Sequence, residues 1–465
     1  MEDRIRNVFE AQQQHKLLLR KSDAETRIQK LRILKRGITS FEEELYASLQ
    51  ADLRKCRFET AVTEIYFTYA EIDFAIKHLE SWMKPVTVSP NISNLFAGNK
   101  IYHDPKGVCL IIAPWNYPFQ LLMSPLISAI AAGNTAILKP SELSGATAAV
   151  ISKMIAALFS PGEIACFEGD AELSSILLAL PFDHVFFTGS TAVGKIVMAA
   201  AAKHLSSVTL ELGGKSPVVI DASADLSKAA EKIAWGKLIN AGQTCIAPDY
   251  VLIDETLETK FIGFYKAACE RMFFRDGKID TAVYAKIISL KHFNRLKGLL
   301  NSAVDDGATL SWGGEQDEST LTFLPAVLTT VKNTQAIMQE EIFGPLLPVI
   351  PFKALDEAIA FINARDKPLA LYVFSGKKTS VEQIIRETSS GGVCVNDVLV
   401  HISNPNLPFG GVNKSGMGSC HGFFGFKNFS HERAVVFQSK LGLTKMIYPP
   451  YDKKGRLLKW LKRLM

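Results

Sequence analysis

Residues 107–138, GVCLIIAPWNYPFQLLMSPLISAIAAGNTAIL, form a run of 32 amino acids without a charged side chain. On length alone such a run could cross a bilayer as a helix. Prolines and amides interrupt it, however, and a spanning helix would leave backbone groups unsatisfied in lipid at those breaks. The interrupting residues are Pro114, Asn116, Pro118, Gln120 and Pro125. We therefore predict a buried strand, a loop and a buried helix, with a membrane span as the alternative.

Short apolar runs of this kind recur along the chain, separated by helical patterns. A first series lies at 108–113, 135–138, 164–167, 184–187 and 208–210; a second begins at 217–220 and continues through amphipathic helices at 257–272 and 355–362. Such alternation is typical of α/β proteins in which a ligand binds at the strand ends. We predict two doubly wound parallel-sheet domains, preceded by helices over residues 1–80. An extended β-arm near 85–102 is predicted in addition.

Composition limits the classes of function. At 465 residues the chain exceeds what one hydrophobic core usually serves. Its net charge of +5, from 52 basic and 47 acidic side chains, is too small to indicate a nucleic-acid partner. Seven cysteines without C-x-x-C spacing fit a reducing compartment, without disulfides or structural zinc. No secretory signal opens the chain, so we expect a cytoplasmic protein.

Two short motifs carry candidate chemistry: Glu211–Lys215, ELGGK, and Gly242–Cys245, GQTC. A thiol can add to a carbonyl carbon, and water activated by a carboxylate can later cleave the resulting thioester. Gly242 permits close backbone approach, and the polar neighbours of Cys245 are expected to favour an exposed thiolate. The alternative is a buried, inert cysteine and a charge at a strand end.

A nucleotide site is less clear, because the G-x-G-x-x-G fingerprint is absent. Lys139–Glu142, KPSE, follows the second predicted strand, where a carboxylate or ammonium can hydrogen-bond a ribose. Phe187–Ser190, FTGS, leads through Gly194 into a helix whose N-terminus would attract a phosphate. As isolated strings, both also fit an ordinary turn and helix cap.

Several longer strings resemble the signatures of the aldehyde dehydrogenase superfamily. They are VTLELGGKSP (208–217), GQTCIAPDY (242–250), EEIFGP (340–345), LPFGG (407–411) and SGMG (415–418). Others are similar to its class 3 branch, which contains fatty, aromatic and coniferyl-type aldehyde dehydrogenases. These are PWNYPF (114–119), KPSELS (139–144), AWGKLINAGQTCIAPDY (234–250), SGMGSCHGFFGFKNFSHERAV (415–435) and IYPPY (447–451).

The resemblance implies roles for individual residues. Cys245 would be the nucleophile and Glu211 the general base, while the Asn116 side-chain amide, otherwise a loop-capping group, would stabilise an oxyanion together with the Cys245 N–H. The implied cofactor-binding residues are Trp115, Lys139, Glu142, Gly189, Ser190, Gly194, Glu341 and Phe343. The expected cofactor is NAD, with NADP as an alternative, because Glu142 would accept a hydrogen bond from a free 2′-hydroxyl and repel a 2′-phosphate. No metal is expected.

Two departures from the family pattern are visible. Tyr284-Ala285-Lys286 replaces the usual Y-G-R, and Asn413 stands where the family has a glycine. Because Asn tolerates left-handed backbone better than most residues, we expect only a local adjustment at Asn413. His421 and His431 are assigned packing or hydrogen-bonding roles near a dimer region.

The function implied is oxidation of a medium- or long-chain aliphatic or aromatic aldehyde to the carboxylic acid, through a Cys-linked thiohemiacetal and thioester. The alternatives are a CoA-acylating enzyme of the same fold and a catalytically retired structural protein. The expected division of the chain is an NAD(P)-binding domain (1–84 and 103–210), a catalytic domain (211–420), an oligomerisation arm (85–102 and 430–450) that forms a homodimer, and a basic tail (451–465).

In this tail, residues 456–465 separate into two faces when placed on a helix. The apolar face contains Leu457, Leu458, Trp460, Leu461, Leu464 and Met465; the cationic face contains Arg456, Lys459, Lys462 and Arg463. This pattern fits a helix lying on an anionic membrane surface. It fits equally a helix docked on the partner subunit.

Overall fold

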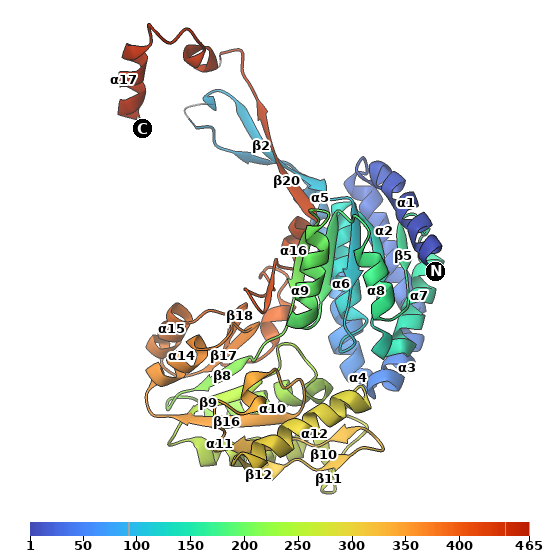
Figure 1. Ribbon diagram of the computed structural model, residues 1–465, viewed down its shortest axis with the longest axis vertical. Helices are drawn as coiled ribbons and strands as arrows, with labels where there is room; N and C mark the ends of the chain where they lie inside the picture. Colours follow the sequence, from blue (N-terminus) through green and yellow to red (C-terminus); the bar gives the residue numbers. More distant parts are fainter. Residues whose placement is uncertain (92–93, 442, 465) are drawn as a thin grey trace.

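The protein is described by a computed structural model that covers residues 1–91, 94–441 and 443–464. Two sheets with their covering helices form the body, and a narrow β-arm projects from one end (Figure 1). This architecture confirms the predicted fold class of two parallel-sheet α/β units plus an arm.

The first sheet has six strands in the order β19-β7-β6-β3-β4-β5, all parallel except β19. Side chains alternate across it: Cys109 and Ile111 belong to one core cluster, whereas Val108, Leu110 and Ile112 belong to another. The strands are β3 (Val108–Ile112), β4 (Thr135–Lys139), β5 (Ile164–Cys166), β6 (His184–Thr188), β7 (Ser207–Glu211) and β19 (Gly416–Met417).

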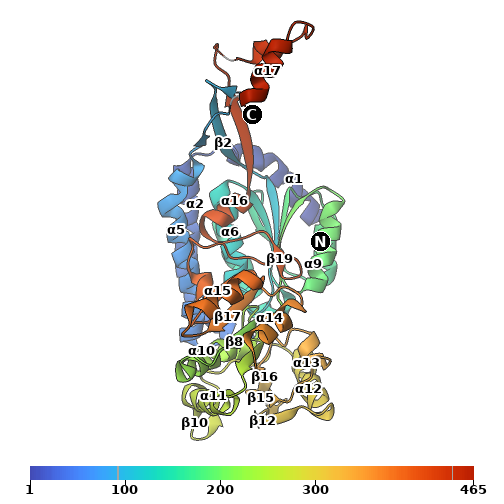
Figure 2. The same ribbon diagram turned by 90° about the vertical axis from the view of Figure 1, so that its left-hand side faces the viewer.

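Helices cover both faces of this sheet, which explains why its strands are mostly apolar. One face carries α1 (Glu2–Leu19), α8 (Ala171–Leu178) and α9 (Thr191–Ala202). The other carries α2 (Ala24–Ser40), α5 (Tyr66–Met83), α6 (Gln120–Ala132) and α7 (Gly145–Leu158), so the helices from the N-terminal region enclose the first sheet (Figure 2). Between α2 and α5 lie α3 (Glu42–Leu53), α4 (Arg57–Thr60) and a π-helical turn, η1 (Ala61–Ile65).

The uncharged run at 107–138 folds as predicted into a buried strand, a loop and a buried helix, namely β3, the loop 113–119 and α6. Every residue of α6 is buried, and Gly133 ends the helix in a left-handed conformation. Among the described residues no helix is both long and apolar enough to cross a membrane.

The second sheet has seven strands in the order β12-β15-β16-β9-β8-β17-β18, parallel except for β12. Its strands are β8 (Pro217–Ile220), β9 (Tyr250–Asp254), β12 (Thr309–Gly313), β15 (Ala326–Thr329), β16 (Leu346–Phe352), β17 (Ala370–Phe374) and β18 (Gly392–Val395). Its helices are α10 (Leu226–Leu238), α11 (Glu258–Phe273), α12 (Leu290–Asp305), α13 (Ala336–Gln339), α14 (Leu355–Asn363) and α15 (Lys378–Glu387). The chain then returns to the first sheet, where Gly416 of β19 pairs with Glu211 of β7.

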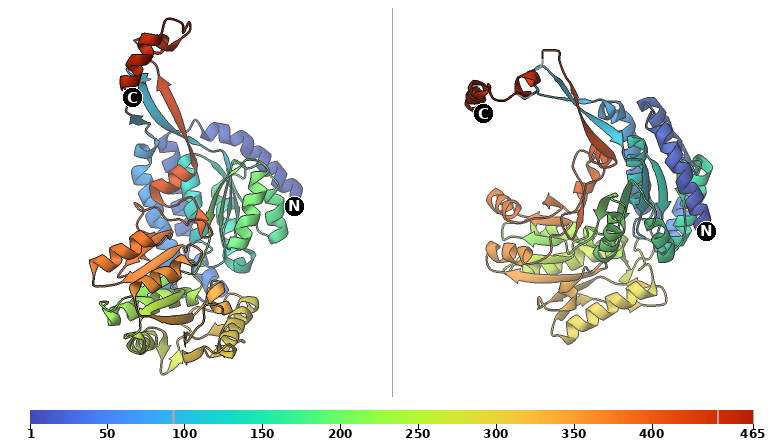
Figure 3. Two further views of the ribbon diagram at one scale, coloured as in Figure 1. Left: turned by 60° about the vertical axis from the view of Figure 1, so that its left-hand side comes forward. Right: turned by 45° about the horizontal axis from the view of Figure 1, so that its top comes forward.

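The arm is a three-stranded antiparallel sheet of β1 (Val86–Val88), β2 (Gly98–Pro105) and β20 (Ser430–Phe437). It rises away from the body, and α17 (Gly455–Leu464) lies beyond its tip (Figure 3). Helix α16 (Gly422–Asn428) connects the body to β20. The two-faced pattern predicted for the tail includes side chains that lie outside the described part of the structure. These are the side chains of Leu457, Trp460, Leu461, Arg463, Leu464 and Met465.

Candidate active site

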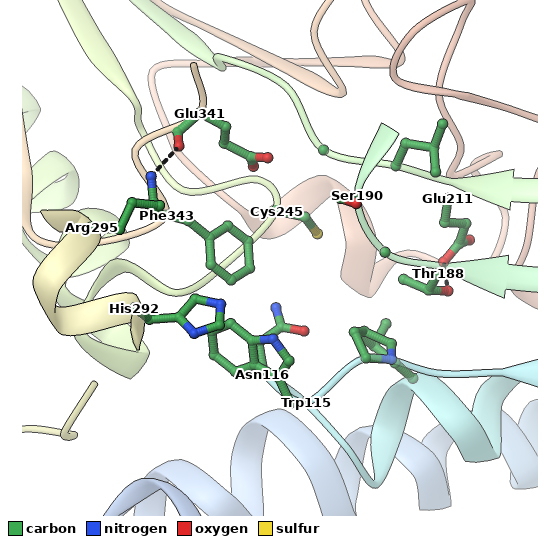
Figure 4. A pocket seen from close by; sticks show the side chains of 15 residues that line it. Trp115, Asn116, Thr188, Ser190, Glu211, Cys245, His292, Arg295, Glu341 and Phe343 are labelled. Atoms are coloured by element: carbon green, nitrogen blue, oxygen red, sulfur yellow. Dashed lines mark hydrogen bonds between the residues drawn. The ribbon is translucent and has the colours of Figure 1, made fainter. Parts of the chain in front are cut away.

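Cys245 lies where two cavities meet, and it contributes to the lining of both. One cavity contains the polar candidates Asn116, Glu211 and Glu341, and the other is apolar. Figure 4 shows the Cys245 sulfur between Glu341 and Phe343 on one side and Glu211 on the other. The structure thus brings together groups that are separated by up to 225 positions in the sequence (116 to 341).

Residues before Cys245 form a strained turn that only a glycine can complete. After α10, Asn240 and Ala241 have φ angles of 51° and 52°, and Gly242 has a φ of 79°. A Cβ on Gly242 would lie 2.4 Å from the Gly344 carbonyl oxygen, closer than two such atoms can approach. The turn therefore fixes where the cysteine enters the site.

Asn116 is tied to this turn by hydrogen bonds. Its side-chain Nδ2 donates to the Gln243 carbonyl at 3.0 Å, and its own carbonyl accepts from Asn240 Nδ2 at 2.8 Å. The Asn116 side chain is buried, yet it lines the polar cavity beside the cysteine. An amide held in this way can present its second N–H to a charge that develops on a bound substrate.

The polar neighbours of Cys245 are engaged in structural hydrogen bonds, and Cys245 itself is partly exposed. Gln243 donates through Nε2 to the carbonyls of Asn240 and Lys286, and the Thr244 hydroxyl bonds Tyr117 at 2.7 Å, so both polar groups are used structurally. Burial raises the pKa of the Cys245 thiol well above its usual value, and the nearby Glu341 and Glu211 raise it further. The thiol is therefore harder to ionise than that of an ordinary cysteine, and a reactive thiolate at Cys245 stays a prediction.

Glu211 ends β7 and is 5% exposed. Its Oε2 accepts a hydrogen bond from the Thr188 hydroxyl at 3.3 Å. Burial raises the pKa of Glu211 above that of an ordinary carboxyl group, although His421, Cys420 and Thr188 oppose the shift. A carboxylate with a raised pKa is suited to accept a proton near neutral pH.

Glu341 and Phe343 enter the polar cavity from the loop after α13. Burial and the nearby Asp249 raise the pKa of Glu341 to about 8. Phe343, with a φ of 49°, meets Trp115 edge-on at 5.4 Å. These two side chains line the same cavity as Gly189 and Ser190, and Ser190 caps the first turn of α9.

The remaining predicted cofactor residues lie outside this cavity lining. Lys139 is almost buried at the end of β4, and its Nζ pairs with Glu142 Oε2 at 2.8 Å. Gly194 lies inside α9, where a Cβ would come within 2.7 Å of the Leu212 side chain. Gly194 thus permits close packing of α9 on the chain segment that follows Glu211.

Sequence reasoning missed two groups in the polar cavity, His292 and Arg295 on α12. His292 meets Trp115 edge-on at 4.9 Å, while Arg295 donates to the Glu341 carbonyl at 3.2 Å and also to the Ile342 carbonyl (Figure 4). Arg295 therefore holds the loop that carries Glu341 and Phe343. The sequence shows only an amphipathic helix here, so no local signal marks these residues.

The second cavity reaches Cys245 from the other side and has a volume of about 210 Å³. Its walls come from η1, α5, α6, α10 and the residues around 399–403, and they are mostly apolar. The lining includes Val62, Phe67, Leu121, Trp235, Ile239, Ile246, Leu399 and Ile402. Such a lining favours the apolar part of a small molecule.

The departures from the family pattern are accommodated locally. Asn413 has a φ of 56°, which confirms the left-handed backbone expected there. Lys286 Nζ donates to the Ala51 carbonyl at 2.8 Å, and Arg54 donates to the Tyr284 and Ala285 carbonyls. By contrast, His421 lies buried beside Glu71 in the body of the protein, and does not belong to the arm.

Comparison with known proteins agrees with this geometry. The Aldehyde dehydrogenase family matches residues 2–435. The chain is 45% identical to a 4,4'-diaponeurosporen-aldehyde dehydrogenase of Staphylococcus aureus (strain NCTC 8325 / PS 47), covering 94% of each chain. It is 45% identical to Aldehyde dehydrogenase family 3 member A2 of Pongo abelii, covering 91% of this chain and 87% of that relative.

A solved structure of Staphylococcus aureus AldH, in a substrate-bound state, superimposes with a TM-score of 0.94 at 42% identity, covering 98% of this chain and 99% of that chain. Family match, relatives and solved structure all extend over nearly the whole chain. The chain therefore belongs to the aldehyde dehydrogenase family and oxidises an aldehyde to a carboxylic acid, with NAD or NADP as the hydride acceptor.

Proposed function

We propose that Cys245 is the nucleophile, Glu211 the general base for hydrolysis, and the Asn116 amide with the Cys245 backbone N–H the oxyanion site. The observation that carries this proposal is the position of Cys245 at the junction of a polar and an apolar cavity. An aldehyde whose apolar part occupies the second cavity would present its carbonyl carbon at the sulfur.

In this proposal, the partly exposed Cys245 thiol first loses its proton to solvent in the polar cavity that it lines. The thiolate adds to the carbonyl carbon, and the negative charge that develops on oxygen is stabilised by Asn116. Bound NAD or NADP would accept a hydride from the tetrahedral carbon, leaving a thioester on Cys245. Glu211 then takes a proton from water, whose oxygen adds to the thioester carbon, and collapse releases the acid and the Cys245 thiolate.

The cofactor fits the polar cavity on two grounds. The first turn of α9 offers backbone N–H groups beside Gly189 and Ser190, a favourable position for a phosphate. A Cβ on Gly213 would lie 2.1 Å from Glu341 Oε2, so a side chain at this position would displace that carboxylate from its place in the cavity. We assign cofactor contacts to Trp115, Lys139, Glu142, Gly189, Ser190, Gly194, Glu341 and Phe343, and expect Glu142 to favour NAD over NADP.

The substrate class follows from the apolar cavity. We propose a medium- or long-chain aliphatic or an aromatic aldehyde, because the lining offers apolar contact over most of its surface. Release as acyl-CoA is disfavoured, since Glu211 lies beside Cys245 and can direct water to the thioester. A retired structural role is also disfavoured by the assembled site.

The test compares Cys245→Ala and Glu211→Gln. The first should lose turnover while still binding NAD, because little volume changes when the nucleophile is removed. The second keeps the shape of the side chain and should produce about one NADH per active site in a burst, then stall as a thioester that mass spectrometry of the Cys245 peptide detects. Substantial steady-state oxidation by Cys245→Ala would reject the covalent route.

We further propose the division of the chain into an NAD(P)-binding domain (1–84 and 103–210), a catalytic domain (211–420) and an oligomerisation arm (85–102 and 430–450). The projecting three-stranded sheet supports a homodimer formed through the arm, because long exposed strands are rarely left uncovered in a monomer (Figure 2). Light scattering at micromolar concentration measures this, and a monomeric mass would contradict it.

For the basic tail (451–465) we propose contact with anionic membrane surfaces, with docking on a partner subunit as the alternative. Helix α17 lies beyond the tip of the arm, away from the body (Figure 1). Truncation after Tyr451 should reduce sedimentation with anionic vesicles, and equal binding by the truncated protein would exclude a membrane role. The seven cysteines, all free in the described chain, support a cytoplasmic location.

A further inference from the structure

Behind Glu211 lies a cluster of titratable side chains that the proposed mechanism does not use. His421, which precedes α16, hydrogen-bonds through Nδ1 to Glu71 Oε1 on α5. Its side chain is 4% exposed and that of Glu71 is 9% exposed. The cluster forms because β19 pairs with β7 at Glu211, which brings the following residues, Cys420 and His421, to the end of that strand.

The two carboxylates of this cluster each carry an unsatisfied oxygen. Among the described residues, Glu211 Oε1 and Glu71 Oε2 are buried without a hydrogen-bond partner. A buried carboxylate is costly unless a positive charge or hydrogen bonds compensate for lost water. The Thr188 hydroxyl and the Cys420 thiol are neutral donors to Glu211, so they compensate only in part.

His421 is the cation that faces both carboxylates. Burial alone would lower the pKa of its imidazole, but Glu71 and Glu211 outweigh burial and the pKa is raised. The titratable groups that face His421 are Glu71 from α5 and Glu211 from β7. Those that face Glu211 are His421, Cys420, Glu71 and, from the polar cavity, Cys245. His421, hydrogen-bonded to Glu71, therefore holds a proton to higher pH than an ordinary histidine.

The position of the imidazole is determined by backbone and packing. His421 has a φ of 67°, a conformation that residues other than glycine rarely adopt. Its ring meets Phe67 edge-on at 5.5 Å and lies 5.6 Å from Phe409. Phe67 itself lines the apolar cavity, so the imidazole sits directly behind the wall of the proposed substrate site.

We propose that His421, held by Glu71, is a positioning residue whose positive charge keeps Glu211 ionised, so that thioester hydrolysis proceeds at neutral pH. This rests on the proposed role of Glu211 as general base. Without the charge, burial of Glu211 would be uncompensated, and its carboxyl group would hold a proton to higher pH. A protonated Glu211 cannot activate water, so deacylation would fail in the pH range where the native enzyme works.

The experiment measures deacylation against pH in the full-length protein, as steady-state NADH production after the burst. The variants are His421→Gln, which removes the charge, and His421→Asn, which also removes it and tolerates the left-handed backbone at this position. The matched control is His204→Gln, a change at an exposed histidine whose ring bonds the Ala179 carbonyl. For both cluster variants the acidic midpoint should move upward by about one pH unit or more, with an unchanged hydride-transfer burst. The control should retain the native midpoint.

The outcomes separate this inference from the proposed function. If Glu211→Gln stalls after the burst but both cluster variants keep the native midpoint, the inference is wrong and Glu211 remains the base. If Glu211→Gln turns over normally, the role of Glu211 itself fails. Loss of the burst together with turnover in folded His421→Gln would also overturn the inference, because the residue would then act before the thioester forms. If His421→Gln does not fold, the midpoint of His421→Asn decides.

Discussion

Replacing Asn116 by alanine tests the oxyanion site most directly. The change removes the donor proposed to stabilise the charge on the thiohemiacetal oxygen, and loss of one such donor typically lowers kcat by about 10²–10³-fold, or about 2.7–4 kcal/mol. The fold should survive. The Gln243 carbonyl loses the 3.0 Å bond from Asn116 Nδ2 but keeps the 3.1 Å bond from Asn240 Nδ2. We therefore expect a loss of about 1 kcal/mol in the free energy of unfolding.

The assay is stopped-flow NADH absorbance with saturating aldehyde and NAD. Because Asn116 would act before hydride transfer, the burst phase itself should slow, whereas Glu211→Gln should keep a fast burst. Asn301→Ala, at an exposed position of α12, controls for a change of the same chemical kind away from the site. A folded Asn116→Ala protein whose burst rate stays within about threefold of the native rate would refute an oxyanion role, since even one such donor is expected to contribute about 10²-fold.

Three further changes follow from the same geometry. Gly242→Ala should destabilise the protein by at least about 1–2 kcal/mol, measured by urea unfolding, because its φ of 79° and the approach to Gly344 exclude a Cβ; an unchanged midpoint would contradict this. Glu142→Gln should raise kcat/KM for NADP relative to NAD by about fivefold or more, since it removes a charge expected to repel the 2′-phosphate. An unchanged ratio of the two kcat/KM values would show that the adenosine ribose does not bind at Glu142. Val62→Asp should raise KM for long-chain aldehydes about tenfold, because a charge in the apolar cavity disturbs chain contacts that contribute about 0.8 kcal/mol for each buried methylene. The KM of short-chain aldehydes should stay unchanged. An equal effect from Val304→Asp, on the surface of α12, would show that the change is nonspecific.

The fold could be predicted in outline because its signals are local. Short apolar runs such as 108–113 and 185–187 are typical of strands in a sheet covered on both faces, and the structure places both in the first sheet. The same holds for the run at 107–138, where Pro114 and Pro118 lie in the loop between β3 and α6. Even the left-handed backbone at Asn413 follows from the properties of one residue.

The candidate site was partly predictable, because reactive side chains stand in distinctive short motifs. GQTC and ELGGK identify Cys245 and Glu211, and the structure brings both to one cavity. The protonation state of Cys245 could not be predicted in the same way. It depends on burial and on Glu341, which is distant in sequence, and these raise the pKa of the thiol despite its polar neighbours.

By itself the sequence determined the strands, the helices and the identity of the reactive groups, since each of these depends on residues close together in the chain. Only the tertiary structure decided which distant groups meet. His292 and Arg295 reach the polar cavity because α12 packs beside the Glu341 loop. His421 reaches Glu211 because a two-residue strand returns from the second sheet to the first. Contacts of this kind depend on how helices and strands pack in space. No local pattern encodes them, because the burial and the electrostatic environment of a side chain are set by all of its neighbours together.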